Sequence, residues 1–230
     1  GEMMGVLIKT FNRFPKFKNS CKINILEKSK LLKRIQKTKI KDANIKWLNN
    51  LEELNDFPCI FIANEFFDAL PIKQFLKKEK KWFERHVNFS NINNLEFLDI
   101  PFDIQKFEKV IKFKISYKQT FIEYSPLAEK YLKTIINKIK LNNGGILIID
   151  YGYFEKKMKD TLQAVSKHKY CDVLKNFRNS DITYNLNFNL INTMIKKLNP
   201  CSSLLTTQKK FLTNLGILDR AQILSKNMPF

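Results

Sequence analysis

The chain has 230 residues, 44% of them hydrophobic and 20 of them phenylalanine, which suffices for one good-sized core. Its formal net charge is +19, and it has neither a cleavable signal pattern nor an apolar run near the ~20 residues that a membrane span requires. The widely spaced cysteines (Cys21, Cys59, Cys171 and Cys201) argue against a metal pair or a disulfide framework and indicate a reducing compartment.

The first part of the chain alternates helix and strand patterns, which indicates a parallel α/β sheet. Residues 3–14 have the apolar spacing of a short amphipathic helix, which Pro15 is expected to end. Ser29 is placed to cap a later helix, and Glu27 follows the first strand. The expected order is a strand at 23–26, a helix at 30–39, a strand at 44–48, a helical turn at 51–56 and a strand at 59–63.

The last of these strands leads into a polar cluster. Residues 59–63 are apolar throughout, which predicts a parallel strand buried on both faces. Asn64, Glu65 and Asp68 follow directly, and ligands of open parallel sheets bind at the carboxyl ends of the strands. These three residues are therefore site candidates. The alternative is that Asn64 and Asp68 only cap and turn the chain, as both residue types favour caps and turns.

The region after this cluster has weaker patterns. Residues 72–89 predict a hairpin with a charged turn at 77–81. Residues 88–110 are expected to form an irregular insertion, and residues 112–125 an extended segment.

A second buried strand comes later in the chain. Pro126 opens an apolar-striped helix that ends at the Asn-Asn-Gly sequence of residues 142–144. Residues 145–149 then repeat the apolar strand pattern, and Asp150 and Tyr151 stand at its carboxyl end. Both predicted apolar strands thus end in a cluster of polar residues.

The last third is expected to begin with the loop-rich polar segment 152–187, which holds His168 and Asp181. No repeat or low-complexity linker is present, so a single domain is expected. The remaining predicted elements are a helix at 187–198, a short strand at 202–208 and a helix at 208–217.

Five blocks occur in a distinctive order: NEFFDALPIKQF, IIDYGY, DTLQAVSKH, SDITYNLNF and TQKKFLTNLGI. In this combination the chain resembles the MidA-like family of S-adenosylmethionine-dependent methyltransferases, relatives of a mitochondrial complex I assembly factor that methylates protein arginine. The resemblance extends across essentially the whole chain. It implies an α/β, Rossmann-like class I methyltransferase fold, in one partial domain with substrate-facing insertions at residues 76–120 and 152–187. The family's first strand and most of its glycine loop would precede Gly1.

The resemblance also implies a binding site for S-adenosylmethionine. Gly1 would be the last glycine of the loop under the methionine moiety, where a side chain would block close backbone approach. Glu27 would accept hydrogen bonds from both ribose hydroxyls. Trp47 and Leu48 would lie near the adenine, and Asn64 would also contact the cofactor.

By the same resemblance, Asn64, Glu65 and Asp68 would face the methyl group and the incoming nucleophile. A guanidinium is a poor nucleophile because its lone pairs are delocalised and it stays protonated. Carboxylates can orient it and accept its proton, with Glu65 as the first contact and Asp68 as the second. The residues expected to line the substrate channel are Asp150, Tyr151, His168 and Asp181. For His168, a hydrogen-bonded structural histidine is an equal alternative.

The implied function is methylation of arginine in a protein, a complex I subunit, in the bacterial cytoplasm or the mitochondrial matrix. The alternative is a non-catalytic remnant or interaction module of the same fold that has lost cofactor binding. Strands that lack a neighbour expose their edges, so a partner chain or self-association could complete the sheet. A third hypothesis, nucleic-acid binding, rests only on the +19 charge. The lysines are spread over the whole length without any recognition signature, so no specific nucleic acid is expected.

Overall fold

The structure is a computed structural model that describes residues 2–40, 42, 44–91, 94–175, 177–199 and 203–226. The chain forms two compact units, Gly1–Phe57 and Pro58–Phe230, and each has its own hydrophobic core. Among the described residues, no helix combines the length and the apolar character that crossing a membrane would need.

The first unit is built on two parallel strands, β1 (Ile23–Leu26) and β2 (Ile45–Leu48). The helix between them, α3 (Lys30–Lys39), begins at Ser29, whose hydroxyl accepts the backbone N–H of Leu32 at 3.2 Å. These elements lie where the sequence predicts them, because local caps and apolar spacing define each one. The remaining elements of this unit are α1 (Glu2–Phe11), α2 (Pro15–Ser20) and the short 3-10 helix η1 (Leu51–Glu53).

Pro15 does more than end the first helix. It is the first residue of α2, a position that suits proline because its missing N–H would have no intrahelical partner there. The small core of this unit consists of Ile8, Ile40 and Ile45, with Met4, Ile23, Ile25 and Trp47 packed against it.

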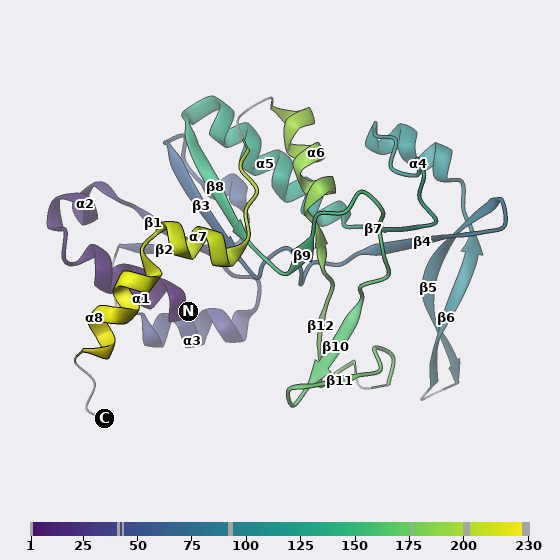
Figure 1. The fold of residues 1–230 in the computed structure, drawn as a ribbon, viewed down its shortest axis with the longest axis horizontal. Helices are drawn as coiled ribbons and strands as arrows, with labels where there is room; N and C mark the ends of the chain where they lie inside the picture. Colours follow the sequence, from purple (N-terminus) through teal and green to yellow (C-terminus); the bar gives the residue numbers. More distant parts are fainter. Residues whose placement is uncertain are drawn as a thin grey trace. The chain divides into compact units, whose positions relative to one another are not determined.

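The second unit is centred on β3 (Cys59–Asn64) and β8 (Gly144–Ile149), which pair in parallel and end together at Asn64 and Ile149. The long helix α5 (Pro126–Asn142) packs against both strands (Figure 1). Gly144 begins β8 with a φ of +128°, and a Cβ at this position would lie 2.0 Å from the carbonyl oxygen of Cys59. Only glycine fits this junction.

The expectation that β3 is buried on both faces is wrong for the described structure. Ile60 is 77% exposed and Ile62 is 42% exposed, whereas Ala63 belongs to the core. The reason is that alternate side chains of a strand point to opposite faces, and α5 packs on the face of β3 that Ile60 and Ile62 do not share.

An antiparallel sheet with the order β6-β5-β4-β7 extends from this centre (Figure 1). Its strands are β4 (Lys73–Lys78), β5 (Lys81–Asn91), β6 (Asn94–Pro101) and β7 (Phe121–Tyr124). The predicted hairpin is confirmed as β4–β5. The expected irregular insertion at 88–110 is wrong, because most of it forms the end of β5, the strand β6 and the helix α4 (Ile104–Ile111).

The segment 152–187, expected to be loop-rich, also contains regular structure. β9 (Gly152–Tyr153) pairs in parallel with β13 (Leu186–Asn187). A three-stranded antiparallel sheet forms the arm between them, in the order β11-β10-β12. Its strands are β10 (Gln163–Ser166), β11 (Lys169–Cys171) and β12 (Asp181–Thr183). Such short strands escape sequence patterns because period-2 alternation needs more residues to stand out.

The helices α6 (Phe188–Leu198), α7 (Gln208–Asn214) and α8 (Ile217–Ser225) complete the described chain. The short strand predicted at 202–208 is wrong, because residues 203–207 form no strand and residue 202 lies outside the described residues. The most deeply buried members of the main core are Phe67, Phe75, Ile122, Tyr124, Leu132 and Leu186.

Candidate functional site

The site candidates of the second unit gather where β3 and β8 end. The backbone N–H of Glu65 donates to the carbonyl oxygen of Ile149 at 2.8 Å, which extends the strand pairing by one residue. Asp150 follows β8 at the same edge. Because parallel strands end side by side, two segments about 80 residues apart in the sequence come together here, and Asp150 accepts the backbone N–H of Phe67 and interacts with Asp68.

The turn after β3 is held by aromatic side chains. Phe67 is fully buried, and the ring of Phe66 lies edge-on to the ring of Tyr131 with centroids 5.1 Å apart. Glu65, by contrast, is exposed and has a left-handed φ of +46°. A non-glycine residue in this conformation is strained, and such strain persists where the surrounding packing imposes it. The two phenylalanines thus fix Glu65 and Asp68 on either side of them.

Asp68 and Asp150 form a pair of interacting carboxyl groups. Asp68 is only 5% exposed, and the Oδ2 atom of Asp150 accepts the backbone N–H of Phe67 at 3.2 Å. Burial raises the pKa of Asp68, and the charges of Glu65 and Asp181 raise it further. Burial, followed by the charge of Asp68, raises the pKa of Asp150 to about 7. In the described structure the Oδ1 atoms of both residues are buried without a hydrogen-bond partner.

Residues 184–186, which follow the arm, form backbone hydrogen bonds with the segments that carry Asp68 and Asp150. The N–H of Tyr184 donates to the carbonyl oxygen of Asp68 at 3.1 Å, and the N–H of Leu186 donates to that of Tyr151 at 2.9 Å. The Tyr184 side chain is buried, which raises the pKa of its phenol, so this group stays neutral. The side chain of Tyr151 is 65% exposed.

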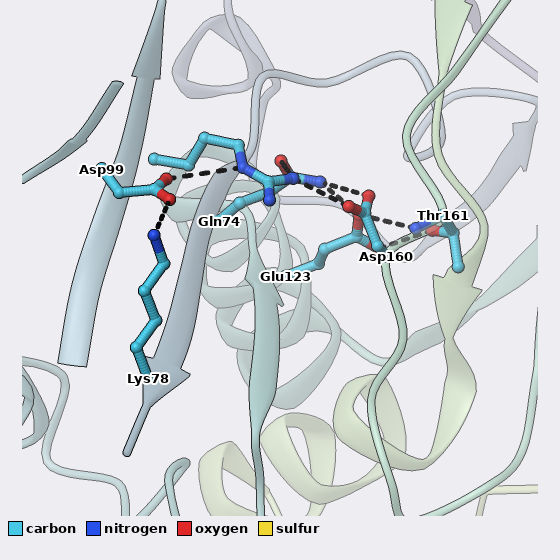
Figure 2. Close-up of polar contacts among 7 residues, drawn as sticks. Gln74, Lys78, Asp99, Glu123, Asp160 and Thr161 are labelled. Carbon is cyan, nitrogen blue, oxygen red and sulfur yellow. Dashed lines mark hydrogen bonds and ion pairs between the residues drawn. The ribbon is translucent and has the colours of Figure 1, made fainter. Parts of the chain in front are cut away.

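A second polar cluster, Gln74, Glu123, Asp160 and Thr161, connects the arm to the antiparallel sheet (Figure 2). Glu123 is buried and accepts hydrogen bonds from the N–H and the hydroxyl of Thr161 and from the Gln74 amide. Burial raises the pKa of Glu123, and these hydrogen bonds oppose the rise. Thr161 Oγ1 in turn accepts the N–H of Asn185 at 3.0 Å. The cluster therefore holds Asn185, and the residue before it, Tyr184, donates its N–H to the backbone carbonyl of Asp68.

Charged groups at the outer side of this cluster continue onto the neighbouring strands. Arg85 Nη1 donates to Asp160 Oδ2 at 2.8 Å, and its Nε lies 3.7 Å from Asp99 Oδ1. Lys78 Nζ lies 2.9 Å from the other oxygen of Asp99 (Figure 2). These ion pairs are more exposed than Glu123, so each contributes less to stability.

Glu27, Trp47 and Leu48, three of the residues expected to hold the cofactor, belong to the first unit, and Asn64 ends β3 in the second unit. Glu27 Oε1 accepts the N–H of Ser29 at 2.9 Å, and Oε2 accepts the side-chain amide of Gln36 at 2.8 Å. The other end of that amide accepts the indole N–H of Trp47 at 3.1 Å. A carboxylate has about four lone-pair positions, so Glu27 keeps capacity for two hydroxyl donors. These remaining acceptor positions therefore fit the hydroxyl donors of the ribose of a nucleoside cofactor.

Two other expected cofactor residues contribute less to this picture. Leu48 is 1% exposed and belongs to the interior of the first unit. Gly1 lies outside the described residues.

The structure brings together most of the expected substrate-facing residues of the second unit, but His168 is apart from them. Asp181 acts on the pKa of Asp68, whereas His168 is exposed in the tight turn that joins β10 to β11. Lys167 and His168 both have positive φ, the geometry of a two-residue hairpin turn. The contacts of Glu123, Thr161 and Tyr184 were not predicted. They carry no local signal, because their partners are distant in the sequence.

The chemical capacity of the site follows from its charges. Glu65, Asp68, Asp150 and Asp181 give one edge of a strongly basic chain a local negative character. Among the described residues no set of three or more His, Cys, Asp or Glu side chains is arranged to hold a metal ion. Carboxylates in this arrangement suit an organic cation, and a guanidinium in particular, because its planar N–H groups bind carboxylates in pairs.

Comparison with known families gives a match over most of the chain. Residues 1–207 match the family model described as "Putative S-adenosyl-L-methionine-dependent methyltransferase".

Among similar proteins, the chain is 30% identical over 193 residues to "Protein arginine methyltransferase NDUFAF7 homolog, mitochondrial" of Caenorhabditis elegans, covering 81% of this chain and 44% of the relative. It is 26% identical over 258 residues to "Protein arginine methyltransferase NDUFAF7, mitochondrial" of Xenopus tropicalis, covering 97% of this chain and 57% of the relative. The chain thus spans about half the length of the relatives it matches.

Two crystal structures from Burkholderia thailandensis have a similar fold. One, a protein bound to S-adenosyl-homocysteine, has a TM-score of 0.69 at 23% identity, covering 90% of this chain and 55% of the other. A native structure has a TM-score of 0.68 at 21% identity, covering 90% of this chain and 57% of the other. These likenesses confirm the α/β, class I methyltransferase-like fold predicted from the sequence.

Proposed function

The chain belongs to the family of S-adenosyl-L-methionine-dependent methyltransferases whose model matches residues 1–207, and we propose that it methylates arginine side chains of a protein. The MidA-like resemblance drawn from the five sequence blocks is confirmed by this match and by the named relatives. The cofactor predicted from that resemblance is the one that names the family. The methyl acceptor is the part that the proposal adds.

One observation carries the choice of arginine. The pair of the buried Asp68 and the half-buried Asp150 lies at the carboxyl ends of two parallel strands, and the carboxylates of Glu65 and Asp181 act on Asp68. Such a site favours a cation with several N–H donors over a neutral or anionic acceptor. The exposed Glu65 makes the first contact with an incoming guanidinium, and Asp68 makes the second. Asn64 supports both from the end of β3.

The cofactor would be held by residues of the first unit. Glu27 would accept the ribose hydroxyls with its remaining lone pairs, and the indole of Trp47, fixed by Gln36, would lie against the adenine. When bound, S-adenosylmethionine supplies an electrophilic methyl group. The chain's own contribution is to orient the acceptor nitrogen and to take the proton that this nitrogen loses.

For the protein substrate we propose a subunit of respiratory complex I, as the MidA-like resemblance implies. In a eukaryotic cell the proposed location is the mitochondrial matrix, which agrees with the word "mitochondrial" in the names of the relatives, and in a bacterium it is the cytoplasm. Asp150, Tyr151 and Asp181 would line the path of the substrate, with His168 at the edge of the arm.

The test is methyl transfer by the full chain from radiolabelled S-adenosylmethionine to a set of arginine-containing peptides, with mass spectrometry of the products. Matched peptides with lysine in place of arginine are the control. Methylarginine in the first set alone supports the proposal. Methyllysine, or label in neither set while the chain binds the cofactor, contradicts it.

A non-catalytic interaction module is the second candidate, and the exposure of Ile60 and Ile62 on β3 favours it. Exposed apolar strand residues recruit partners or cause self-association. Calorimetric titration with S-adenosylmethionine separates the two functions, since a module that has lost the cofactor gives no saturable heat although it is folded.

A further inference from the structure

The Asp68–Asp150 pair has an unusual hydrogen-bond balance. Each residue has a buried Oδ1 atom to which no group in the described part of the chain donates. A buried acceptor without a donor is energetically unfavourable, because it has lost its hydrogen bonds to water and gained none in return. Because the two carboxyl groups also interact directly with each other, one proton held between them would give these oxygens a donor.

The groups facing the pair do not supply a countercharge. Outside the pair, the charges that act on Asp68 are the carboxylates of Glu65, from the turn after β3, and Asp181, from β12, and both raise its pKa. The phenol of Tyr184 is neutral. Backbone N–H groups, those of Phe67 and Asp68 on Asp150 and that of Ala69 on Asp68, lower the two pKa values, but burial outweighs them. Two like charges in contact at this largely buried position do not both ionise below about pH 7.

We infer that Asp68 and Asp150 share one proton in the free chain and release it to solvent when a guanidinium binds them. The pair then changes from one negative charge to two, while the released proton carries the balancing positive charge away. The guanidinium takes over the role of the proton. Its N–H groups can donate to both Oδ1 atoms, and its positive charge offsets the repulsion between the two carboxylates.

This exchange rests on the proposed function and adds a second role to it. The emptied carboxylates are the acceptor for the proton that arginine must lose as it is methylated. The site therefore prepares its own base only when the substrate is present. Asp150 joins Glu65 and Asp68 as a residue that would touch the acceptor.

The exchange predicts a specific pH dependence. Below the pKa of Asp150, which is about 7, a proton competes with the guanidinium for the pair. The dissociation constant is then expected to fall about tenfold for each rise of one pH unit and to level off above about pH 7.

The experiment is calorimetric titration of the full chain with methylguanidinium chloride at about pH 6, in phosphate and in MES, whose ionisation enthalpies differ. Proton release appears as a difference in heat between the buffers and is expected to approach one proton per ligand near pH 6 and to vanish near pH 8. Asp150→Asn should abolish the difference, since the amide still accepts the Phe67 N–H but carries no titrating proton. Asp172 lies on the surface, with its Oδ2 atom 3.8 Å from Lys175 Nζ. The control variant Asp172→Asn removes the same charge there and should retain the difference in heat between the buffers.

A second measurement needs no ligand. Carbon-13 NMR of labelled aspartate carboxyls should show one resonance that titrates near pH 7 in the free chain and disappears in Asp150→Asn. If every aspartate titrates near its ordinary value, the inference is wrong. Methylguanidinium binding without proton release also overturns it but leaves the proposed function standing. If methylguanidinium does not bind at all, the inference fails, and the peptide methylation assay decides the proposed function separately.

Discussion

Replacing Asp150 by asparagine should stabilise the second unit at alkaline pH. Because burial raises the pKa of Asp150 from 3.8 to about 7, the folded chain binds more protons than the unfolded chain between these values. The free energy of unfolding therefore falls as the pH rises from about 4 to about 7. Above about pH 7 the stability contributed by the protonated Asp150 is fully lost. Asparagine has nearly the same shape but no titrating proton, so the stability of Asp150→Asn should not fall in this pH range.

The magnitude follows from the pKa. A rise from 3.8 to about 7 corresponds to about 4 kcal/mol at 1.36 kcal/mol per pH unit. Solvent reaches part of the Asp150 side chain, and screening reduces this to about 2 kcal/mol. We expect Asp150→Asn to unfold with a free energy about 2 kcal/mol above that of the unmodified chain near pH 8, and within about 0.5 kcal/mol of it near pH 4.

Urea unfolding followed by tryptophan fluorescence measures this difference. Trp82 packs against the main core, so a Trp47→Phe background makes the signal report the second unit alone. Asp172→Asn, on the surface, is the matched control and should change the stability by less than about 0.5 kcal/mol at either pH. Equal stabilities of Asp150→Asn and the unmodified chain at both pH values would refute the reasoning, because Asp150 would then ionise in the folded chain without penalty.

Three further predictions concern the surroundings of the site. Glu123→Ala should destabilise the second unit by about 2–4 kcal/mol in urea unfolding, since it leaves buried donors without an acceptor. Asp99→Asn, in the exposed ion pairs, should cost less than about 1 kcal/mol. Similar losses for both variants would contradict the role given to Glu123. Glu27→Ala should weaken S-adenosylmethionine binding by about tenfold or more in calorimetry, as two charge-assisted hydrogen bonds are lost, and unchanged affinity would remove Glu27 from the cofactor site. Gly152→Ala should destabilise by more than about 2 kcal/mol, because the added Cβ would lie 2.3 Å from the carbonyl oxygen of Leu186, and a melting temperature equal to that of the unmodified chain would show that β9 and β13 separate easily.

The sequence predicts those parts of the fold that local physics determines. Ser29 caps α3 and Pro126 opens α5 where the sequence places them, because a cap depends only on residues within one turn. The apolar runs before Asn64 and Asp150 are strands for the same reason. The edge rule for parallel sheets then brings Asp68 and Asp150 together without any knowledge of the contact.

What the sequence misses depends on partners far along the chain. Glu123 is an ordinary residue in an extended segment until Thr161, 38 residues later, donates to it. The strand β6 follows an asparagine-rich stretch, and asparagine is uncommon in strands, so tertiary pairing with β5 decides its conformation.

The Asp68–Asp150 pair combines both cases and suggests why the site is built as it is. Its two carboxylates can be predicted to lie at one edge, but their burial depends on the arm segment whose Tyr184 donates to Asp68. Without that segment the two groups would be solvated and would ionise independently at ordinary pKa values. With it, the fold keeps a pair of acids that destabilises the chain at neutral pH, which natural proteins tolerate where the groups perform chemistry. Under the proposed function the arm therefore tunes the carboxyl groups that meet the substrate, and changes in the arm should alter the pH dependence of the site before they alter the fold.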